Sequence, residues 1–249
     1  MSEKRRRELM LGSQIAPRSA EEFKIFIREQ AKLGPYTLSV ESLDEQIKLA
    51  IVPDVFPPPV NIVLPEYLQT HTRIKTMADI GTGSGVEAIF AAKFGVEYID
   101  AVDINDASIA CAKQNAEMNQ VSEHIQFFVS DLFERIPKGT KYDLIYANLP
   151  FVLSEQIEDA IDVALYDPGF RIHERFFRQA KEYLAKNGSL LMPQADVQRD
   201  ISTNKQNSPD IFHLFEKMSV EEGYSWKLLR ERPFREQNIW RLYECFLPT

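Results

Sequence analysis

Acidic and amide side chains stand at the ends of several short apolar segments, next to turn-forming residues. Asp79 precedes the glycine-rich run Gly81–Gly85. Asp103, Asp131 and Asn148 each follow a later apolar segment. Carboxylates and amides accept hydrogen bonds from hydroxyl and amino groups, and a glycine-rich turn lets a ligand approach bare backbone where a helix begins. One such acid would indicate only a solvated strand end, but their repetition indicates a site for a nucleoside-like ligand.

From residue 73 onward, strand-like and helix-like segments alternate, and these elements must position the polar residues. The expected strands are 75–80, 98–103, 124–129, 142–147 and 189–192, and the expected helices are 84–94, one that begins at Asn105 or Asp106, 172–186 and 209–222. Two closing strand-like runs, 224–231 and 238–247, are too close together for a helical crossover and must pair antiparallel. The sequence therefore predicts an α/β fold, a doubly wound, mostly parallel, Rossmann-like sheet of seven strands with an antiparallel terminal hairpin.

Ligands of such a sheet bind beyond the carboxyl ends of the strands. Asp103 follows Gly81 by about 20 residues, where an acid accepts the hydroxyls of a ribose, and Asp131 is placed to accept from an adenine amino group. Gly85 comes one position earlier than the third glycine of the dinucleotide fingerprint. Asp79 would repel a diphosphate but would accept from the ammonium of an amino acid. This combination favours S-adenosylmethionine over NAD.

Four segments resemble, in order, the motifs of the class I S-adenosylmethionine-dependent methyltransferases: Asp79–Gly85, Val102–Asn105, Ser130–Leu132 and Asn148–Phe151. The resemblance covers about 75–247, and the closing hairpin fits the reversed seventh strand of that family. It implies S-adenosyl-L-methionine as the cofactor. The residues implied to bind it are Asp79, Gly81, Thr82, Gly83, Gly85, Asp103, Ile104, Asn105, Asp131, Leu132 and Asn148.

The fourth motif resembles more narrowly the amino-methylating branch with Asn-Pro-Pro-Tyr at this place. That branch includes the glutamine methyltransferases of release factors and ribosomal proteins, small-subunit RNA methyltransferases and adenine-N6 methyltransferases of RNA and DNA. The implied catalytic residues are Asn148, Leu149, Pro150 and Phe151. The Asn148 side-chain oxygen and the Leu149 carbonyl would accept the two N–H groups of the acceptor, and Phe151 would stack on its plane.

Leu149 departs from the branch, which has proline there. Leucine supplies the same carbonyl, and Pro150 still favours an extended Leu149. Because the ribosomal-RNA adenine dimethyltransferases have a similar Asn-Leu-Pro-aromatic form, the departure leaves activity intact but leaves the acceptor open.

We therefore expect an S-adenosylmethionine-dependent N-methyltransferase that acts on a planar amide or amino nitrogen. A formal net charge of −8 favours an acceptor protein, through a glutamine, or a small molecule over nucleic acid. Adenine N6 of RNA or DNA is the alternative acceptor. An alternative of another class is a non-catalytic protein that binds S-adenosylmethionine.

Residues 1–72 form a smaller N-terminal region, and the methyltransferase domain is expected over 73–249. The region is expected to contain a helix over 1–34, a β-hairpin of strands 36–40 and 47–52, a proline-rich strap at Pro53–Pro59 and a short helix within 61–72. The strap either crosses the mouth of a site or is a plain linker, and it resembles the leading segment of the glutamine and small-subunit RNA enzymes. A lid over the substrate is one role for this region. The basic cluster Lys4–Arg7 is a solvated helix end or a contact for RNA or an acidic partner.

Other functional classes lack support. The two cysteines, Cys111 and Cys245, have no metal-ligand spacing, so we expect both in the core and no metal site. With no apolar run of membrane-spanning length and no secretion signal, we expect a soluble, cytoplasmic protein without a membrane partner. His173 lies in the loop 159–173, which is expected to cover the acceptor. A base role for His173 is open, although the pattern favours a partly exposed histidine at a helix start.

Overall fold

The computed structural model describes residues 25, 28–29, 35–58, 62–153, 157–158, 160–196, 210–234 and 238–248. The basic cluster Lys4–Arg7 and most of the helix expected over 1–34 lie outside these residues. The strands are β1 (Tyr36–Ser42), β2 (Glu45–Ile51), β3 (Thr76–Ile80), β4 (Tyr98–Asp103), β5 (Ile125–Val129), β6 (Tyr142–Ala147), β7 (Leu184–Ala195), β8 (Ser225–Phe234) and β9 (Asn238–Phe246). The α-helices are α3 (Leu64–Thr70), α4 (Val86–Lys93), α5 (Asp106–Met118), α6 (Ala160–Leu165), α7 (Arg171–Ala180) and α8 (Ile211–Glu221).

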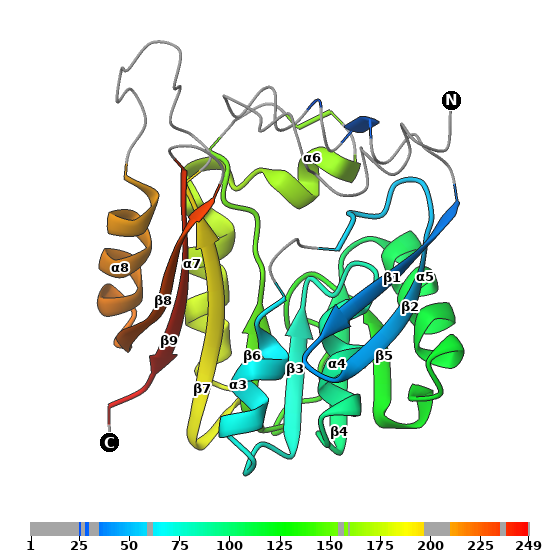
Figure 1. Cartoon of the computed structure of the whole chain (residues 1–249). Coiled ribbons are helices and arrows are strands. Elements are labelled where there is room, and N and C mark those ends of the chain that lie inside the picture. Colours follow the sequence, from blue (N-terminus) through cyan, green and yellow to red (C-terminus); the bar gives the residue numbers. More distant parts are fainter. Residues whose placement is uncertain are drawn as a thin grey trace.

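The main sheet has seven strands in the order β5-β4-β3-β6-β7-β9-β8 (Figure 1). The strands from β5 to β7 pair in parallel, while β9 runs antiparallel to both of its neighbours, β7 and β8. This confirms the predicted doubly wound sheet with its terminal hairpin. Strand order reverses between β3 and β6, which places a ligand crevice at their carboxyl ends.

Helices cover both faces of this sheet. Successive side chains of a strand point to opposite faces, so Met77 joins a core with α3, α4 and the β1–β2 hairpin, whereas Ala78 joins a second core with α7 and α8. Both cysteines are buried, as expected. No helix in the described ranges is long and apolar enough to cross a membrane.

The boundary between α7 and β7 differs from the prediction. The helix ends at Ala180 and β7 begins at Leu184, whereas the sequence predicts a helix over 172–186, a strand that begins at 189 and the pair Asn187-Gly188 between them. This pair lies at a shift in register between β6 and β7. A Cβ at Gly188 would stand 2.7 Å from the carbonyl oxygen of Tyr142. The glycine therefore permits close approach of two strands and does not end a helix.

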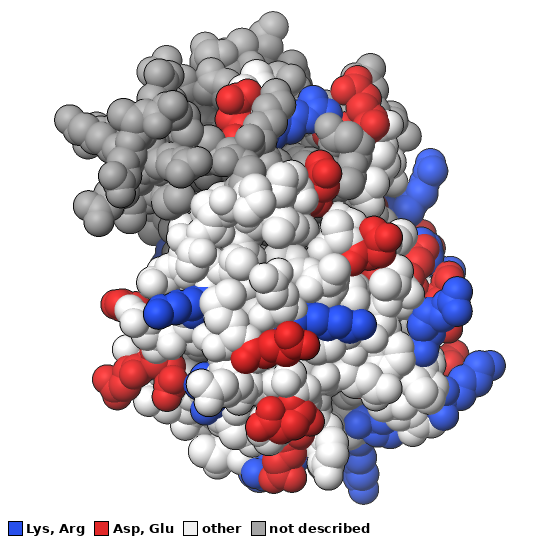
Figure 2. Space-filling model, turned by 90° about the vertical axis from the view of Figure 1, so that its right-hand side faces the viewer, with Lys and Arg blue, Asp and Glu red and all other residues white. Residues whose placement is uncertain are grey.

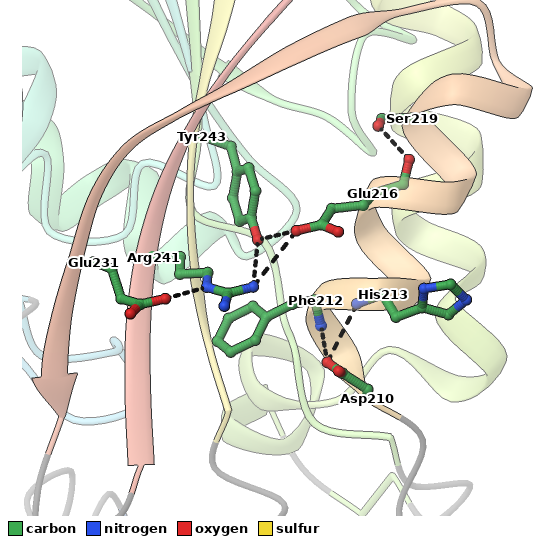
Figure 3. Close-up of polar contacts among 8 residues, drawn as sticks. All are labelled: Asp210, Phe212, His213, Glu216, Ser219, Glu231, Arg241 and Tyr243. Carbon is green, nitrogen blue, oxygen red and sulfur yellow. Dashed lines mark hydrogen bonds and ion pairs between the residues drawn. The ribbon is translucent and has the colours of Figure 1, made fainter.

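A polar network fastens α8 to the terminal hairpin (Figure 3). The Tyr243 hydroxyl donates to Glu216 at 2.7 Å, and Arg241 donates to Glu231 at 2.7 Å. The guanidinium of Arg241 also lies 4.2 Å from the ring centre of Phe212. These contacts join α8, β8 and β9 at the edge of the sheet away from the predicted ligand site.

Two asparagines of α5 hold the β1–β2 hairpin against the main domain. The side chain of Asn115 accepts from the N–H of Ala50 at 2.7 Å and donates to the carbonyl of Ala50 at 3.0 Å. It also donates to the carbonyl of Ser84, in the glycine-rich turn, at 2.9 Å. Asn119, one turn later, makes the same pair of bonds with the backbone of Lys48. The free edge of β2 is thus paired with side chains.

We expect Asn115→Ala to lower the free energy of unfolding by about 1–3 kcal/mol, because it removes the hydrogen-bond partner of the Ala50 N–H and of the Ser84 carbonyl. The matched variant Asn119→Ala should cost less, because its partners at Lys48 are reached by water. Urea denaturation monitored by circular dichroism measures both. An equal or larger loss for Asn119→Ala would contradict this account of the docking.

Candidate active site

The turn between β3 and α4 depends on three glycines in the left-handed region, Gly81 (φ +78), Gly83 (φ +53) and Gly85 (φ +82). The N–H groups of Gly81 and Thr82 both donate to the carbonyl of Val102, at 2.8 and 2.9 Å, so the turn crosses the end of β4. Side chains are disfavoured at these φ values. The turn is thereby fixed where it meets the ligand crevice.

The predicted site residues come together in one pocket beyond the carboxyl ends of β3, β4, β5 and β6. Those that line it are Asp79, Gly81, Thr82, Gly83, Asp103, Ile104, Asn105, Asp131, Leu132, Asn148, Leu149, Pro150 and Phe151. Gly85 is outside the lining. A Cβ on Gly85 would stand 3.0 Å from the Cβ of Ala112, so this glycine serves the packing of α4 on α5. The individual roles of the lining residues stay predictions.

Asp103 is held at the pocket wall by backbone groups. One carboxylate oxygen accepts from the N–H of Gly83 and the other from the N–H of Asn105, both at 2.9 Å. Burial raises the pKa of Asp103, and these backbone N–H groups oppose that rise. Each oxygen keeps a second lone pair, so the carboxylate fits the two hydroxyls of a ribose.

The proline-rich strap forms one wall of the pocket and is more than a linker. Asp54, Phe56, Pro57 and Pro58 all line it. The side chain of Asn105 donates to the carbonyl of Asp54 at 2.8 Å, which ties the strap to the loop after β4. A mostly apolar wall of this kind excludes water from a ligand beneath it.

Helix α6, from the loop expected to cover the acceptor, supplies part of another wall. Val163, Ala164 and Leu165 line the pocket there. Arg175 of α7 also lines it and forms an ion pair of 2.7 Å with Asp131. Arg175 is not among the residues predicted from the sequence. Its position in a helix does not indicate which strand end its side chain contacts.

Two further polar residues of the pocket were missed, Glu87 and Tyr146. Glu87 is 4% exposed and accepts from the Tyr146 hydroxyl at 3.1 Å. Burial, followed by the neighbouring Asp79, raises the pKa of Glu87 to about 8. A signal for Glu87 was available in the sequence, where it is a lone acid within the apolar segment 86–92.

Asp79 lies at the base of the same region and is 2% exposed. Its carboxylate accepts from the Thr82 hydroxyl at 2.6 Å. Burial raises the pKa of Asp79 to about 7, and the charge of Asp103 adds to the rise. A buried carboxyl of this kind fits a cationic ligand group, such as an ammonium.

The expectation of a partly exposed His173 is wrong. Its ring is fully buried, outside the pocket lining, and stacks on Phe170 at a centroid distance of 3.8 Å. One ring nitrogen lies 2.7 Å from the carboxylate of Asp167, and the other lies 3.1 Å from the side-chain nitrogen of Gln194. Partners from the segment before α7 and from β7 thus hold His173 in the core, which leaves it no contact with a ligand in this pocket.

Two polar atoms of residues that line the pocket have no hydrogen-bond partner in the part of the chain that the structure describes. They are Glu87 Oε2 and Ser84 Oγ, and both are buried. Buried polar atoms normally have partners, so a ligand with N–H and O–H groups fits this wall. The carboxyl groups at the ends of β3 and β4 and just after β5 suit the ammonium, the ribose and the adenine of S-adenosylmethionine, respectively.

Comparison with known proteins decides the family. The family model described as ribosomal protein L11 methyltransferase matches residues 62–172. A protein of Methanocaldococcus jannaschii, provisionally named a protein N5-glutamine methyltransferase, is 32% identical over 206 residues, which are 80% of this chain and 98% of that protein. The chain belongs to the class I S-adenosylmethionine-dependent methyltransferases. It is therefore an enzyme of methyl transfer, with S-adenosylmethionine as the methyl donor.

Other relatives match a shorter part of the sequence. The release factor glutamine methyltransferase of Fusobacterium nucleatum is 32% identical over 123 residues, which are 45% of this chain and 34% of the relative. The chain therefore spans about a third of that protein.

Solved methyltransferase structures share the fold. The ribosomal protein L11 methylase of Lactobacillus delbrueckii subsp. bulgaricus is 21% identical, with a TM-score of 0.51 over 76% of this chain and 80% of its own. The 16S rRNA N2 G1207 methyltransferase of T. thermophilus, in complex with AdoMet and guanosine, is 18% identical. Its TM-score is 0.62 over 86% of this chain and 51% of its own.

We expect the cofactor-free protein to lose stability as the pH rises from about 5 to about 8. The pKa values of Asp79 and Glu87 are raised to about 7 and about 8 from ordinary values of 3.8 and 4.5. Between the ordinary and the raised pKa values, the folded state holds protons that the unfolded chain has released. Each rise in pH therefore lowers the free energy of unfolding until the pH has passed the raised pKa values.

Thermal melting across this pH range measures the effect. Glu87→Gln removes one of the two raised groups, so its melting temperature should fall less between pH 5 and pH 8 than that of the wild type. A wild-type melting temperature that climbs over this range, or the same slope in the variant, would contradict the burial argument.

Proposed function

We propose that this methyltransferase transfers its methyl group to the side-chain amide nitrogen of a protein glutamine. The observation that carries the proposal is the position of Asn148–Phe151 in the same pocket as Asp79 and the glycine turn. A Cβ at Gly81 would lie 3.8 Å from the carbonyl oxygen of Asn148. The acceptor motif and the donor turn are therefore neighbours.

The names of several relatives support a glutamine acceptor. Besides the M. jannaschii and F. nucleatum proteins, the ribosomal protein uL3 glutamine methyltransferase of Francisella tularensis is 30% identical over 129 residues, which are 48% of this chain and 41% of that protein. The M. jannaschii relative carries most weight, because its alignment spans nearly its whole length.

An amide nitrogen is a weak nucleophile because its lone pair is delocalised into the carbonyl. The Asn148 side-chain oxygen and the Leu149 carbonyl would accept its two N–H groups and turn the lone pair toward the methyl carbon. Leu149 is 3% exposed, so its carbonyl belongs to a fixed, buried segment. Pro150 favours an extended Leu149, and Phe151 lines the pocket as a plane on which the amide can stack.

The reaction itself needs no strong base. A bond forms between the amide nitrogen and the methyl carbon, the bond from that carbon to sulfur breaks, and its electron pair stays on sulfur. The methylated nitrogen then releases a proton to water. Alignment of nitrogen, carbon and sulfur by the protein supplies much of the acceleration, and the apolar strap around Phe56 and Pro57 keeps competing water away.

The surface also supports a protein over a nucleic acid as the acceptor. On the face in Figure 2, the described lysine and arginine side chains lie among acidic ones and not in one continuous basic patch. The whole chain carries a net charge of −8. A phosphate backbone is bound mainly through clustered basic side chains.

We further propose that the division between the two regions falls near residue 72 and that 1–72 contributes to substrate binding through the strap. The docking of β2 on α5 supports a fixed wall at this side of the pocket. A cytoplasmic location fits acceptors of the kind named for the relatives.

We expect Asn148→Ala to lower the rate of methyl transfer by 100-fold or more, while the dissociation constant for S-adenosylmethionine changes by less than about threefold, because the lost interaction is made with the acceptor. Transfer of labelled methyl into cell extract measures the rate, and calorimetry measures cofactor binding. Gln114→Ala changes an exposed amide of α5 outside the pocket lining, so it is the matched control and should keep full activity.

The fate of the label tests the acceptor. Protease treatment should release it, and mass spectrometry of the peptides should place it on glutamine. Label that only nuclease releases would favour adenine N6, and label resistant to both would favour a small molecule. Loss of cofactor binding together with activity in Asn148→Ala would instead indicate a structural role for Asn148.

A further inference from the structure

Two buried carboxyl groups stand close together in the pocket wall without a basic partner. Asp79 comes from the end of β3, and Glu87 comes from the first turn of α4. Their hydrogen-bond partners are neutral groups, the Thr82 hydroxyl and the Ala88 N–H for Asp79 and the Tyr146 hydroxyl for Glu87. Among the described residues, no lysine or arginine forms an ion pair with either acid. Burial of unpaired carboxylates is costly, so these acids ionise fully only when a cationic partner is present.

Glu87 offers the more specific evidence. The Tyr146 hydroxyl donates to its Oε1, whereas its Oε2 is buried and has no hydrogen-bond partner among the described residues. Glu87 itself is one of the residues that line the pocket. The Tyr146 hydroxyl fixes the direction of the carboxyl group, since the tyrosine is itself a buried residue of β6. Oε2 is therefore an oriented acceptor without a donor.

The titratable groups around Glu87 all add negative charge or none. Asp79 faces it from β3 and raises its pKa, Tyr146 faces it from β6, and Asp103 of β4 acts on Asp79 in turn. A neutral N–H donor would satisfy Oε2 but would not offset the cost of ionising these neighbouring acids. A cationic donor satisfies both requirements.

The methyl donor offers one cationic N–H donor, the α-ammonium of its methionine part. Its sulfonium is charged but has no N–H, and its adenine amino group is neutral. The acceptor amide is also neutral. The charge balance of this wall therefore favours the ammonium.

We propose that Glu87 binds the α-ammonium of the methyl donor together with Asp79, so that the ammonium lies between two carboxylates and Tyr146 positions the second one. The ammonium carries three N–H groups, so it can donate to both acids. The inference rests on S-adenosylmethionine as donor and is independent of the glutamine acceptor.

A proton balance follows from this arrangement. Near pH 7 the empty pocket retains protons on the two acids, because the pKa values of Asp79 and Glu87 are raised. The bound ammonium favours both carboxylates in ionised form, so binding must release protons to the buffer.

The test compares two ligands by calorimetry at pH 7. One is S-adenosylhomocysteine, which keeps the ammonium and does not react, and the other is its analogue with hydrogen in place of the α-amino group. Glu87→Gln keeps the shape of the side chain and its acceptor for Tyr146. We expect it to weaken binding of S-adenosylhomocysteine by 10-fold or more and binding of the deaminated analogue by less than twofold.

Titration in buffers of different ionisation enthalpy counts the protons released. The wild type should release protons on binding S-adenosylhomocysteine, and Glu87→Gln should release fewer. Tyr146→Phe should weaken the binding of S-adenosylhomocysteine more than that of the deaminated analogue, but by less than Glu87→Gln does. It provides an independent test if Glu87→Gln does not fold. Glu117→Gln, an exposed acid of α5, is the matched control and should match the wild type.

Several results would overturn the proposal. If Glu87→Gln weakened the binding of both ligands equally, Glu87 would serve only to maintain the shape of the pocket wall. If Glu87→Gln bound S-adenosylhomocysteine as well as the wild type and only raised the KM for the acceptor, Oε2 would bind the acceptor and not the methyl donor. The failure of glutamine as acceptor would leave the calorimetric pattern unaffected, so the two proposals are separable.

Discussion

The single conformation of the turn between β3 and α4 is the constraint on which the rest of the site depends. Its backbone meets the end of β4 through Val102, and Gly85 lies against Ala112 of α5 with no room for a side chain. The carbonyl of Ser84 is bound by Asn115, which also holds β2. A change in this turn would therefore displace α4, the hairpin and the strap together.

The turn also divides the pocket between charged and apolar functions. On the side proposed for the methyl donor, Asp79, Glu87 and Asp103 are acids whose orientation is set by hydrogen bonds from neighbouring hydroxyls and backbone N–H groups. On the side proposed for the acceptor, Leu149, Phe151 and the strap present mostly apolar surface, with Asn148 between the two. This arrangement suits a reaction in which a cationic donor is bound by charge and a neutral amide is held by shape and two hydrogen bonds.

Much of this site could be predicted from the sequence because parallel strands end at the same edge of a sheet. Once the alternation of strands and helices was recognised, Asp79, Asp103, Asp131 and Asn148 had to meet there. Residues on helices were harder to predict. The reach of Arg175 to Asp131 depends on how α7 packs, which local sequence does not encode.

The wrong predictions have the same origin. The burial of His173 depends on Asp167, Phe170 and Gln194, and Gln194 lies on a strand that comes later in the sequence. The Asn187-Gly188 pair has the local chemistry of a helix end, but its role is decided by Tyr142 on the neighbouring strand. In both cases a contact between distant segments overrode a local preference.

The pairing of β2 with the side chains of Asn115 and Asn119 has a consequence for solubility. A strand whose outer N–H and carbonyl groups are unpaired can add a strand from another molecule and so begin aggregation. Here the groups of Lys48 and Ala50 are already bound, by amides that cannot extend a sheet. The asparagines that position the pocket wall thus also protect this edge from association between copies of the chain.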